Sequence, residues 1–362
     1  MYFGPNHPGI EGNYAIRVRL KGDEVLKAEA DGGYLHRGFE KLMEERLWIQ
    51  NVALVPRICV PDPVPMEETY ARAVEMLGGL KVPERAQWIR VMVLEMSRIA
   101  AHLFMVGGHA ATLGLYTNMF WGVALRELLL DRFEELTGGR IYHMYITPGG
   151  VRRDLPDGFL GRLAAVLDEI ERRLPDYDDL FFDNAVVVRR TRGIGTLTQA
   201  EALAWGVTGP NLRATGLAFD LRHEDPYLVY DRLAFDIPTE REGDALARAR
   251  VRRAEIRQSI RILRQVIGHL PGITGPVRCP LPNPLAWNLP AGDVYARTES
   301  SKGELGFYVV SNGGPKPWRV HVRGPSAMHA VQVLERLCVG ARLEDVAQIM
   351  FSLDACPPEV DR

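Results

Sequence analysis

Hydrophobic residues recur at three- and four-residue steps along much of the chain, and this period predicts long helices. After Pro83 and Glu84, apolar residues at 89, 92, 96, 99 and 103 predict a helix that ends at Gly107-Gly108. The same period predicts further helices over 118–137, 155–174 and 245–270. The last of these carries arginines at 248, 250, 252, 253 and 257, which we expect on a solvated outer face or at a subunit contact.

Apolar and polar residues alternate near both ends of the chain, and this predicts strands. An N-terminal hairpin is expected over 14–30, turning at Gly22-Asp23. Segments 294–299, 305–311 and 318–323 predict an antiparallel sheet, followed by helices over 326–338 and 343–353. The chain is therefore predicted to be one mostly helical α+β domain, 1–362, with the hairpin at 14–30, a helical core over 40–270, and the sheet and helices over 294–362.

The composition narrows the class of protein. The chain has 362 residues, of which 46% are hydrophobic, and a formal net charge of -2, so a large core is expected and a nucleic-acid surface is not. No apolar run approaches the roughly 20 residues that span a bilayer, and the N-terminus lacks the pattern of a signal peptide. We expect a soluble cytoplasmic protein that reaches a membrane only through partners.

Two short segments, one near each end, carry a cysteine followed three residues later by a carboxylate. These are Cys59 with Asp62 and Cys356 with Glu359. If the fold brings them together, they make a four-point polar site that could bind a metal, because thiolates favour soft or borderline ions and carboxylates widen the choice. The alternative is that Cys59 and Cys356 are inert core residues, since cysteine is among the most buried residue types.

The remaining patterns are less specific. Cys279 and Cys338 have no nearby partner and are expected to be structural. No zinc-hydrolase helix motif, phosphate-binding loop or dinucleotide-binding fingerprint is present. His7, between prolines and shortly before Glu11, suggests either a proton relay or a turn. Gly32-Gly33, ahead of a Tyr/His/Arg cluster, suggests a close backbone approach or a tight turn.

Several ordered motifs resemble one family along essentially the whole chain. The chain is similar to the D subunit of respiratory complex I, which is homologous to the large subunit of [NiFe] hydrogenases. The motifs are Gly4-Pro5 with His7-Pro8, Gly33 to Lys41, Gln50-Asn51 with Pro56-Arg57, Leu94 to Leu103, Arg213 to Gly216, Glu299 to Gly306, and the terminal Ser352-Leu353-Asp354 and Val360-Asp361-Arg362.

The resemblance implies an altered pocket. Cys59 and Cys356 match the first cysteine of each metal-binding pair of the energy-converting hydrogenases, whereas Asp62 and Glu359 replace the second, so an intact Ni-Fe centre is not expected but another metal is left open. Val60 stands where complex I has its quinone-binding tyrosine. Glu11 occupies the position of the quinone-binding histidine of complex I, and the aspartate that pairs with that histidine falls near Thr112. A protonated Glu11 could still donate a hydrogen bond.

The resemblance also implies partners and a route for electrons. Arg57, and His143 in the Tyr142-His143 region, would lie near an iron–sulfur cluster carried by a small partner subunit similar to the complex I B subunit; no intrinsic cofactor is expected. A C-subunit-like partner and membrane ion-translocating subunits are also implied, with this chain held peripherally on the cytoplasmic side of the membrane. The acceptor pocket would be formed by His7, Glu11, His36, Arg57, Cys59, Val60, Asp62, Cys356 and Glu359.

Three functional hypotheses follow. In the first, the chain is a subunit of a complex I-like oxidoreductase of the NADH:quinone type that passes electrons to a quinone-type acceptor, with coupled ion translocation through its partners. In the second, it is the large subunit of a hydrogenase-related complex acting on another acceptor, such as sulfane sulfur, in which the remaining thiolates take part. In the third, it is a catalytically silent structural or coupling subunit.

Overall fold

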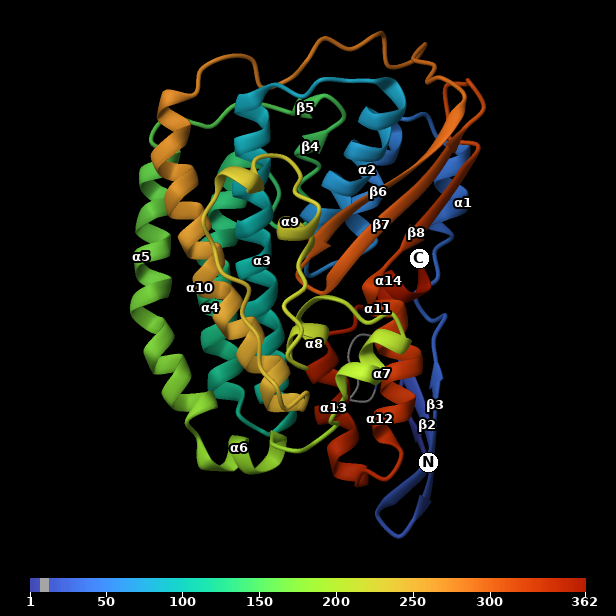
Figure 1. The fold of residues 1–362 in the computed structure, drawn as a ribbon, viewed down its shortest axis with the longest axis vertical. Coiled ribbons are helices and arrows are strands. Elements are labelled where there is room, and N and C mark those ends of the chain that lie inside the picture. The colour runs from blue at the N-terminus through green and yellow to red at the C-terminus, as the bar shows by residue number, and fades with distance from the viewer. Residues whose placement is uncertain (7–12) are drawn as a thin grey trace.

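The computed structural model describes residues 1–6 and 13–362 (Figure 1). The predicted site residues His7 and Glu11 lie outside the described residues. The described part confirms the expected α+β class: helices dominate, a hairpin lies near the N-terminus, and a small antiparallel sheet lies near the C-terminus.

Four long helices run side by side and form one half of the molecule (Figure 1). They are α3 Glu84–Thr112, α4 Tyr116–Thr137, α5 Phe159–Tyr177 and α10 Ala245–His269. Their apolar faces meet in the largest hydrophobic cluster, to which α3 contributes Ile89, Met92, Met96, Ile99 and Leu103, as the sequence period predicted. The core of this half therefore forms around α3.

The prediction that α3 ends at Gly107-Gly108 is wrong, because the helix continues to Thr112. A Cβ atom at Gly107 would lie 3.3 Å from the Cα atom of Met119 on α4. A Cβ atom at Gly108 would lie 3.2 Å from the ring of Phe351. The two glycines therefore allow neighbouring elements to approach α3 closely, and they do not stop it.

The expectation that the arginines of α10 lie on an outer face is also wrong for three of the five. Arg248, Arg252 and Arg253 are buried, whereas Arg257 is exposed. Arg248 donates to the carbonyl oxygens of Gly195 and Gly243, each at 2.8 Å. These side chains face the interior because the neighbouring segments supply acceptors for their N–H groups.

Within residues 1–6 and 13–362, the strands form three small sheets. The hairpin strands β2 Ala15–Lys21 and β3 Glu24–Asp31 are antiparallel, and β1 Tyr2–Phe3 adds an edge that the sequence did not predict. A two-stranded ribbon pairs β4 Ile146–Thr147 with β5 Gly150–Val151. The C-terminal sheet has the order β6-β7-β8, with β6 Gly292–Ser300, β7 Gly303–Ser311 and β8 Arg319–Arg323.

Shorter helices complete the fold. Helix α2, Pro63–Gly78, packs on β6 and β7, and α1, Phe39–Glu45, packs on β8. The middle of the chain holds α6 Ala185–Thr191, α7 Gln199–Ala204, α8 Gly209–Arg213 and α9 Leu221–Glu224. The C-terminal helices are α11 Pro325–Met328, α12 Leu334–Cys338, α13 Val346–Leu353 and α14 Pro357–Asp361, and a π-helical turn over His329–Val333 joins the first two. Across the described residues, no helix has both the length and the apolar character that crossing a membrane requires.

Candidate functional site

The fold brings together three of the four residues of the two predicted Cys-x-x-acid elements. Ligand atoms of Cys59, Cys356 and Glu359 lie within 4.8 Å of one another. All three side chains are buried. Cys59 precedes α2, whereas Cys356 caps the N-terminus of α14 and Glu359 lies in the first turn of that helix. Two distant segments of the chain therefore face each other across one buried polar site.

Ser326, on α11, holds the C-terminal side of this site. The backbone N–H of Ser326 donates to Oε1 of Glu359 at 2.9 Å, and the hydroxyl of Ser326 accepts the N–H of Cys356 at 3.0 Å. Gly324 makes room for the carboxylate, because a Cβ atom there would lie 2.6 Å from the same Oε1. The Cys356 backbone and the Glu359 carboxylate are therefore both held by Ser326.

Burial dominates the acid–base behaviour of the site. It raises the pKa of the Cys59 thiol well above its usual value, and the adjacent Cys356 and Glu359 raise it further. Burial also raises the pKa of Glu359, while the amide of Ser326 and the ammonium of Lys302 oppose that shift. A proton on this carboxyl is therefore easier to retain than on an exposed glutamate.

Asp62 does not join the cluster of described ligand atoms, so the expected four-point arrangement is not formed. Its Oδ1 accepts the hydroxyl of Ser97 at 2.6 Å, and its Oδ2 accepts the backbone N–H of Ser301 at 2.8 Å. In the sequence, Asp62 and Glu359 each follow a cysteine by three residues. That spacing does not show that Asp62 faces α3 and the turn between β6 and β7, away from the two thiols.

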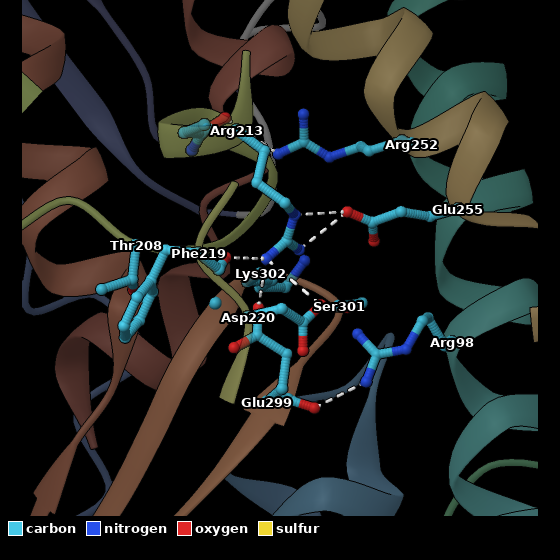
Figure 2. A network of polar contacts seen from close by, with 12 residues as sticks. Arg98, Thr208, Arg213, Phe219, Asp220, Arg252, Glu255, Glu299, Ser301 and Lys302 are labelled. Atoms are coloured by element: carbon cyan, nitrogen blue, oxygen red, sulfur yellow. Dashed lines mark hydrogen bonds and ion pairs between the residues drawn. The ribbon is translucent and has the colours of Figure 1, made fainter. Parts of the chain in front are cut away.

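A buried ionic network borders the site (Figure 2). Figure 2 shows Arg213 between Glu255 on α10 and Asp220 and Glu299, with Arg98 reaching in from α3. The network also includes Lys302, whose Nζ lies 2.5 Å from Oδ1 of Asp354, two residues before Cys356. Lys302 is the cation that acts on both Cys59 and Glu359 to lower their pKa values.

Sequence reasoning did not assign roles to Lys302, Asp354 and Ser326. Lys302 and Asp354 occur in motifs that carry the family resemblance, so that resemblance was a usable signal. Ser326 had no signal in the sequence beyond its place at the start of a predicted helix.

Arg57 lies beside the N-terminal cysteine segment and is half-buried. Its guanidinium carbon lies 4.8 Å from the ring centre of Tyr142, and its side chain also bonds to the carbonyl of Ala53 and contacts the sulfur of Met144 at 3.8 Å. The carbonyl of Arg57 accepts from Arg37 at 2.8 Å. The Arg57 guanidinium is therefore held in place before any partner binds.

His143 and Val60 line one small cavity of about 10 Å³. His143 is buried and stacks on Phe133 with ring centres 4.0 Å apart. Its Nδ1 lies 3.1 Å from the carbonyl oxygen of Gly139, and burial lowers its pKa to about 4. Val60 is half-buried, and its aliphatic side chain has no hydrogen-bond donor.

The other predicted residues have local partners. His36 is exposed, and its Nδ1 lies 2.6 Å from the backbone oxygen of Asp361. The N–H of Gly33 donates to the Asp361 carboxylate at 2.8 Å, and the N–H of His36 donates to the carbonyl of Gly33 at 3.2 Å, so the segment after the paired glycines forms a tight turn as well as a close backbone approach. Thr112 donates to the carbonyl of His109 at 2.7 Å.

The donor set does not fit a dinuclear nickel–iron centre. Such a centre needs four thiolates in the pattern that the resemblance implies, whereas the described pocket offers the thiols of Cys59 and Cys356 and the carboxylate of Glu359. Asp62 is not part of this group of ligand atoms, and its two oxygens accept from Ser97 and Ser301. The donor set therefore gives no basis for nickel–iron chemistry in this pocket.

Comparison with known families gives one match along most of the chain. The family model described as the 49 kDa subunit of the respiratory-chain NADH dehydrogenase matches residues 112–283 and 281–362. The D subunit of the NADH-quinone oxidoreductase of Thermosipho melanesiensis is 50% identical over 100% of this chain and 99% of that protein. The D subunit of the F420H2 dehydrogenase of Methanosarcina mazei is 40% identical over 100% of this chain and 97% of that protein.

Comparison with solved structures gives a similar result. A chain in the structure of the membrane-bound sulfane sulfur reductase, an archaeal respiratory membrane complex, superposes with a TM-score of 0.97. It is 49% identical, and the match covers 100% of this chain and 98% of that one.

Proposed function

The chain belongs to the family of the 49 kDa subunit of the respiratory-chain NADH dehydrogenase, and from this premise we propose that it takes electrons from an iron–sulfur cluster in a partner subunit and passes them to an acceptor beside Cys59, Cys356 and Glu359. It acts as a peripheral subunit of a membrane-bound oxidoreductase complex. The observation that carries this proposal is the convergence of two thiols and a carboxyl at one buried site close to the ordered Arg57 segment.

The geometry favours an acceptor that contains sulfane sulfur. Reduction of one sulfane sulfur atom to hydrogen sulfide consumes two electrons and two protons, and thiols exchange readily with sulfur in this oxidation state. Cys59 and Cys356 provide two neighbouring thiols. Val60 stands where a quinone-binding tyrosine is expected, so the hydroxyl group that would bind a quinone is missing at that position. The likeness to a chain of the sulfane sulfur reductase complex supports the same assignment.

A quinone-type acceptor is the second candidate. It is favoured by the 50% identity to a subunit of an NADH-quinone oxidoreductase. Against it stands Val60, because a valine donates no hydrogen bond to a quinone carbonyl. A quinone headgroup would need another donor, such as a protonated Glu359 or a group of a partner subunit.

Activity of the purified complex with each acceptor tests the proposal. We expect sulfide release from polysulfide to fall strongly in Cys59→Ser and Cys356→Ser, with electron transfer from the natural donor to an artificial dye retained. Lys316→Ala, in an exposed ion pair with Glu45, is the control and should behave as wild type. Wild-type rates with polysulfide and with quinone in both cysteine variants would overturn the proposed pocket.

The same three residues are the donors that we propose for a metal other than a nickel–iron pair. Thiolates suit a soft or borderline divalent ion, which would supply Lewis-acid chemistry at the site. Metal analysis of the purified complex checks this: one equivalent is expected in the wild type and is lost in Cys59→Ala and in Glu359→Gln. Equal metal content in all three proteins contradicts it.

The partners follow from the same family membership. We propose a small iron–sulfur subunit whose cluster lies near Arg57 and His143, a C-subunit-like partner, and membrane subunits that translocate ions. We propose that these partners hold the chain peripherally on the cytoplasmic side of the membrane. Isolation of the complex and identification of its subunits by mass spectrometry tests each partner.

A further inference from the structure

The carboxylate of Asp62 links three elements of the fold. Asp62 is 1% exposed and immediately precedes α2. The Ser97 hydroxyl, on α3, donates to Oδ1 at 2.6 Å, and the backbone N–H of Ser301 donates to Oδ2 at 2.8 Å. The segment that bears Cys59 is therefore tied to α3 and to the turn between β6 and β7.

The same turn reaches the segment that bears the other cysteine. Its Lys302 side chain is paired with Asp354, which lies two residues before Cys356. Both charged side chains are buried. Figure 2 shows Ser301 and Lys302 among the residues of the buried ionic network. One β-turn thus contacts both halves of the candidate site.

The turn is itself held firmly. Arg98 donates to the carbonyl oxygens of Glu299 at 2.7 Å and Ser300 at 2.9 Å. The hydroxyl of Ser300 donates to the carbonyl of Gly303 at 2.8 Å. A Cβ atom at Gly303 would lie 2.5 Å from Oγ1 of Thr208, so only glycine fits at this packed corner. A rigid support of this kind is what a precise site requires.

We infer that Asp62, Ser301 and Lys302 are positioning residues that hold Cys59 and Cys356 opposite each other, and that Asp62 is not a ligand or a proton donor of the site. This deepens the proposed function, because it names what fixes the distance between the two thiols. Asp62, at the position of the second cysteine in the hydrogenase pattern, therefore has a structural role: it binds the Cys59 segment to Ser97 and Ser301.

Disulfide formation measures this geometry without any acceptor. The purified complex is treated with limiting diamide, and the yield of the Cys59–Cys356 disulfide is measured by peptide mass spectrometry. We expect Asp62→Ala to lower the yield by about tenfold, because small displacements of reacting groups have large effects on rate. Asp62→Asn should retain a yield within about twofold of the wild type, since an amide can accept from the Ser301 N–H and donate to the Ser97 oxygen.

Thr298→Val is the matched control. It removes a buried 2.6 Å hydrogen bond between Thr298 and Thr69, which also ties β6 to α2, but it leaves the turn bonds in place. The disulfide yield of this variant should equal that of the wild type. An equal loss in Thr298→Val and Asp62→Ala would show only a general effect of loosening the fold and would overturn the inference.

Two other results would also overturn it. Equal losses in Asp62→Asn and Asp62→Ala would mean that the site needs a carboxylate, and a wild-type yield in Asp62→Ala would mean that the anchor is dispensable. Should Asp62→Ala fail to accumulate, Ser97→Ala removes one of the two bonds: a lower yield supports the inference and a wild-type yield contradicts it. Because the assay uses no substrate, failure of the acceptor assays would leave its result unchanged.

Discussion

Nη1 of Arg213 lies 2.8 Å from Oε1 of Glu299, and neither side chain is exposed to solvent. Nε of the same guanidinium donates to Oε1 of Glu255 at 2.9 Å. Arg213 therefore joins α8, α10 and β6 through charges that are buried away from the protein surface. A buried pair of this kind adds little stability over apolar residues, but loss of one partner leaves an uncompensated charge.

Replacement of this arginine should be strongly destabilising. We expect Arg213→Met to lower the free energy of unfolding by about 3–5 kcal/mol, because Glu255 and Glu299 would stay buried without their cation. Urea unfolding of the purified chain measures the change. In the control, Arg232→Met, the arginine is 55% exposed and pairs with Glu84, so the change should stay within about 0.5 kcal/mol. Similar effects of the two substitutions would contradict the importance of burial.

Glu67 fixes the segment that follows His143. Its carboxylate accepts the backbone N–H groups of Met144 at 2.7 Å, and of Tyr145 and Ile146 at 2.9 Å each. A glutamine has one acceptor oxygen, so Glu67→Gln should leave at least one buried N–H unpaired and cost about 1–3 kcal/mol. Thermal unfolding should show the loss, and it should be absent in Glu169→Gln, whose carboxylate pairs with the exposed Arg172.

The cation of Arg57 should influence the cluster that we propose in the partner subunit. A fixed positive charge favours the reduced cluster, so Arg57→Met is expected to lower its reduction potential by an amount on the order of tens of millivolts. A redox titration of the complex followed by electron paramagnetic resonance measures the potential. Arg57→Lys keeps the charge and should shift the potential less. An unchanged potential in Arg57→Met would place the cluster away from this residue.

The sequence period revealed where the long helices lie, but not what they pack against. Apolar steps located α3 and α10 because helix burial requires a repeating apolar face. The same logic placed Arg248 and Arg252 in solvent, whereas both are buried. Their acceptors, such as the carbonyls of Gly195 and Gly243 for Arg248, come from segments distant in sequence. A one-dimensional pattern cannot show such acceptors.

The candidate site shows the same limit. The spacing marked Cys59 and Cys356 as partners, and the fold brings them together with Glu359. The spacing treated Asp62 and Glu359 alike, although only Glu359 faces the thiols. Which way a carboxylate points depends on its donors, and for Asp62 these are a hydroxyl on α3 and a backbone N–H in a β-turn. Neither donor is visible before the chain is folded.

His143 should make the protein sensitive to acid. Burial lowers its pKa to about 4 from a usual 6.5, so below pH 6.5 the unfolded chain gains a proton that the folded chain does not. Stability should therefore fall as the pH drops from 6.5 to 4 and this contribution should level off below that, with a total of up to about 3 kcal/mol.

His143→Phe cannot titrate and keeps a ring against Phe133, so urea unfolding should show a smaller loss across this window than in the wild type. His321→Phe, at an exposed position, is the control and should leave the wild-type slope. Parallel curves for His143→Phe and wild type would contradict the prediction, because the acid sensitivity would then come from other buried groups.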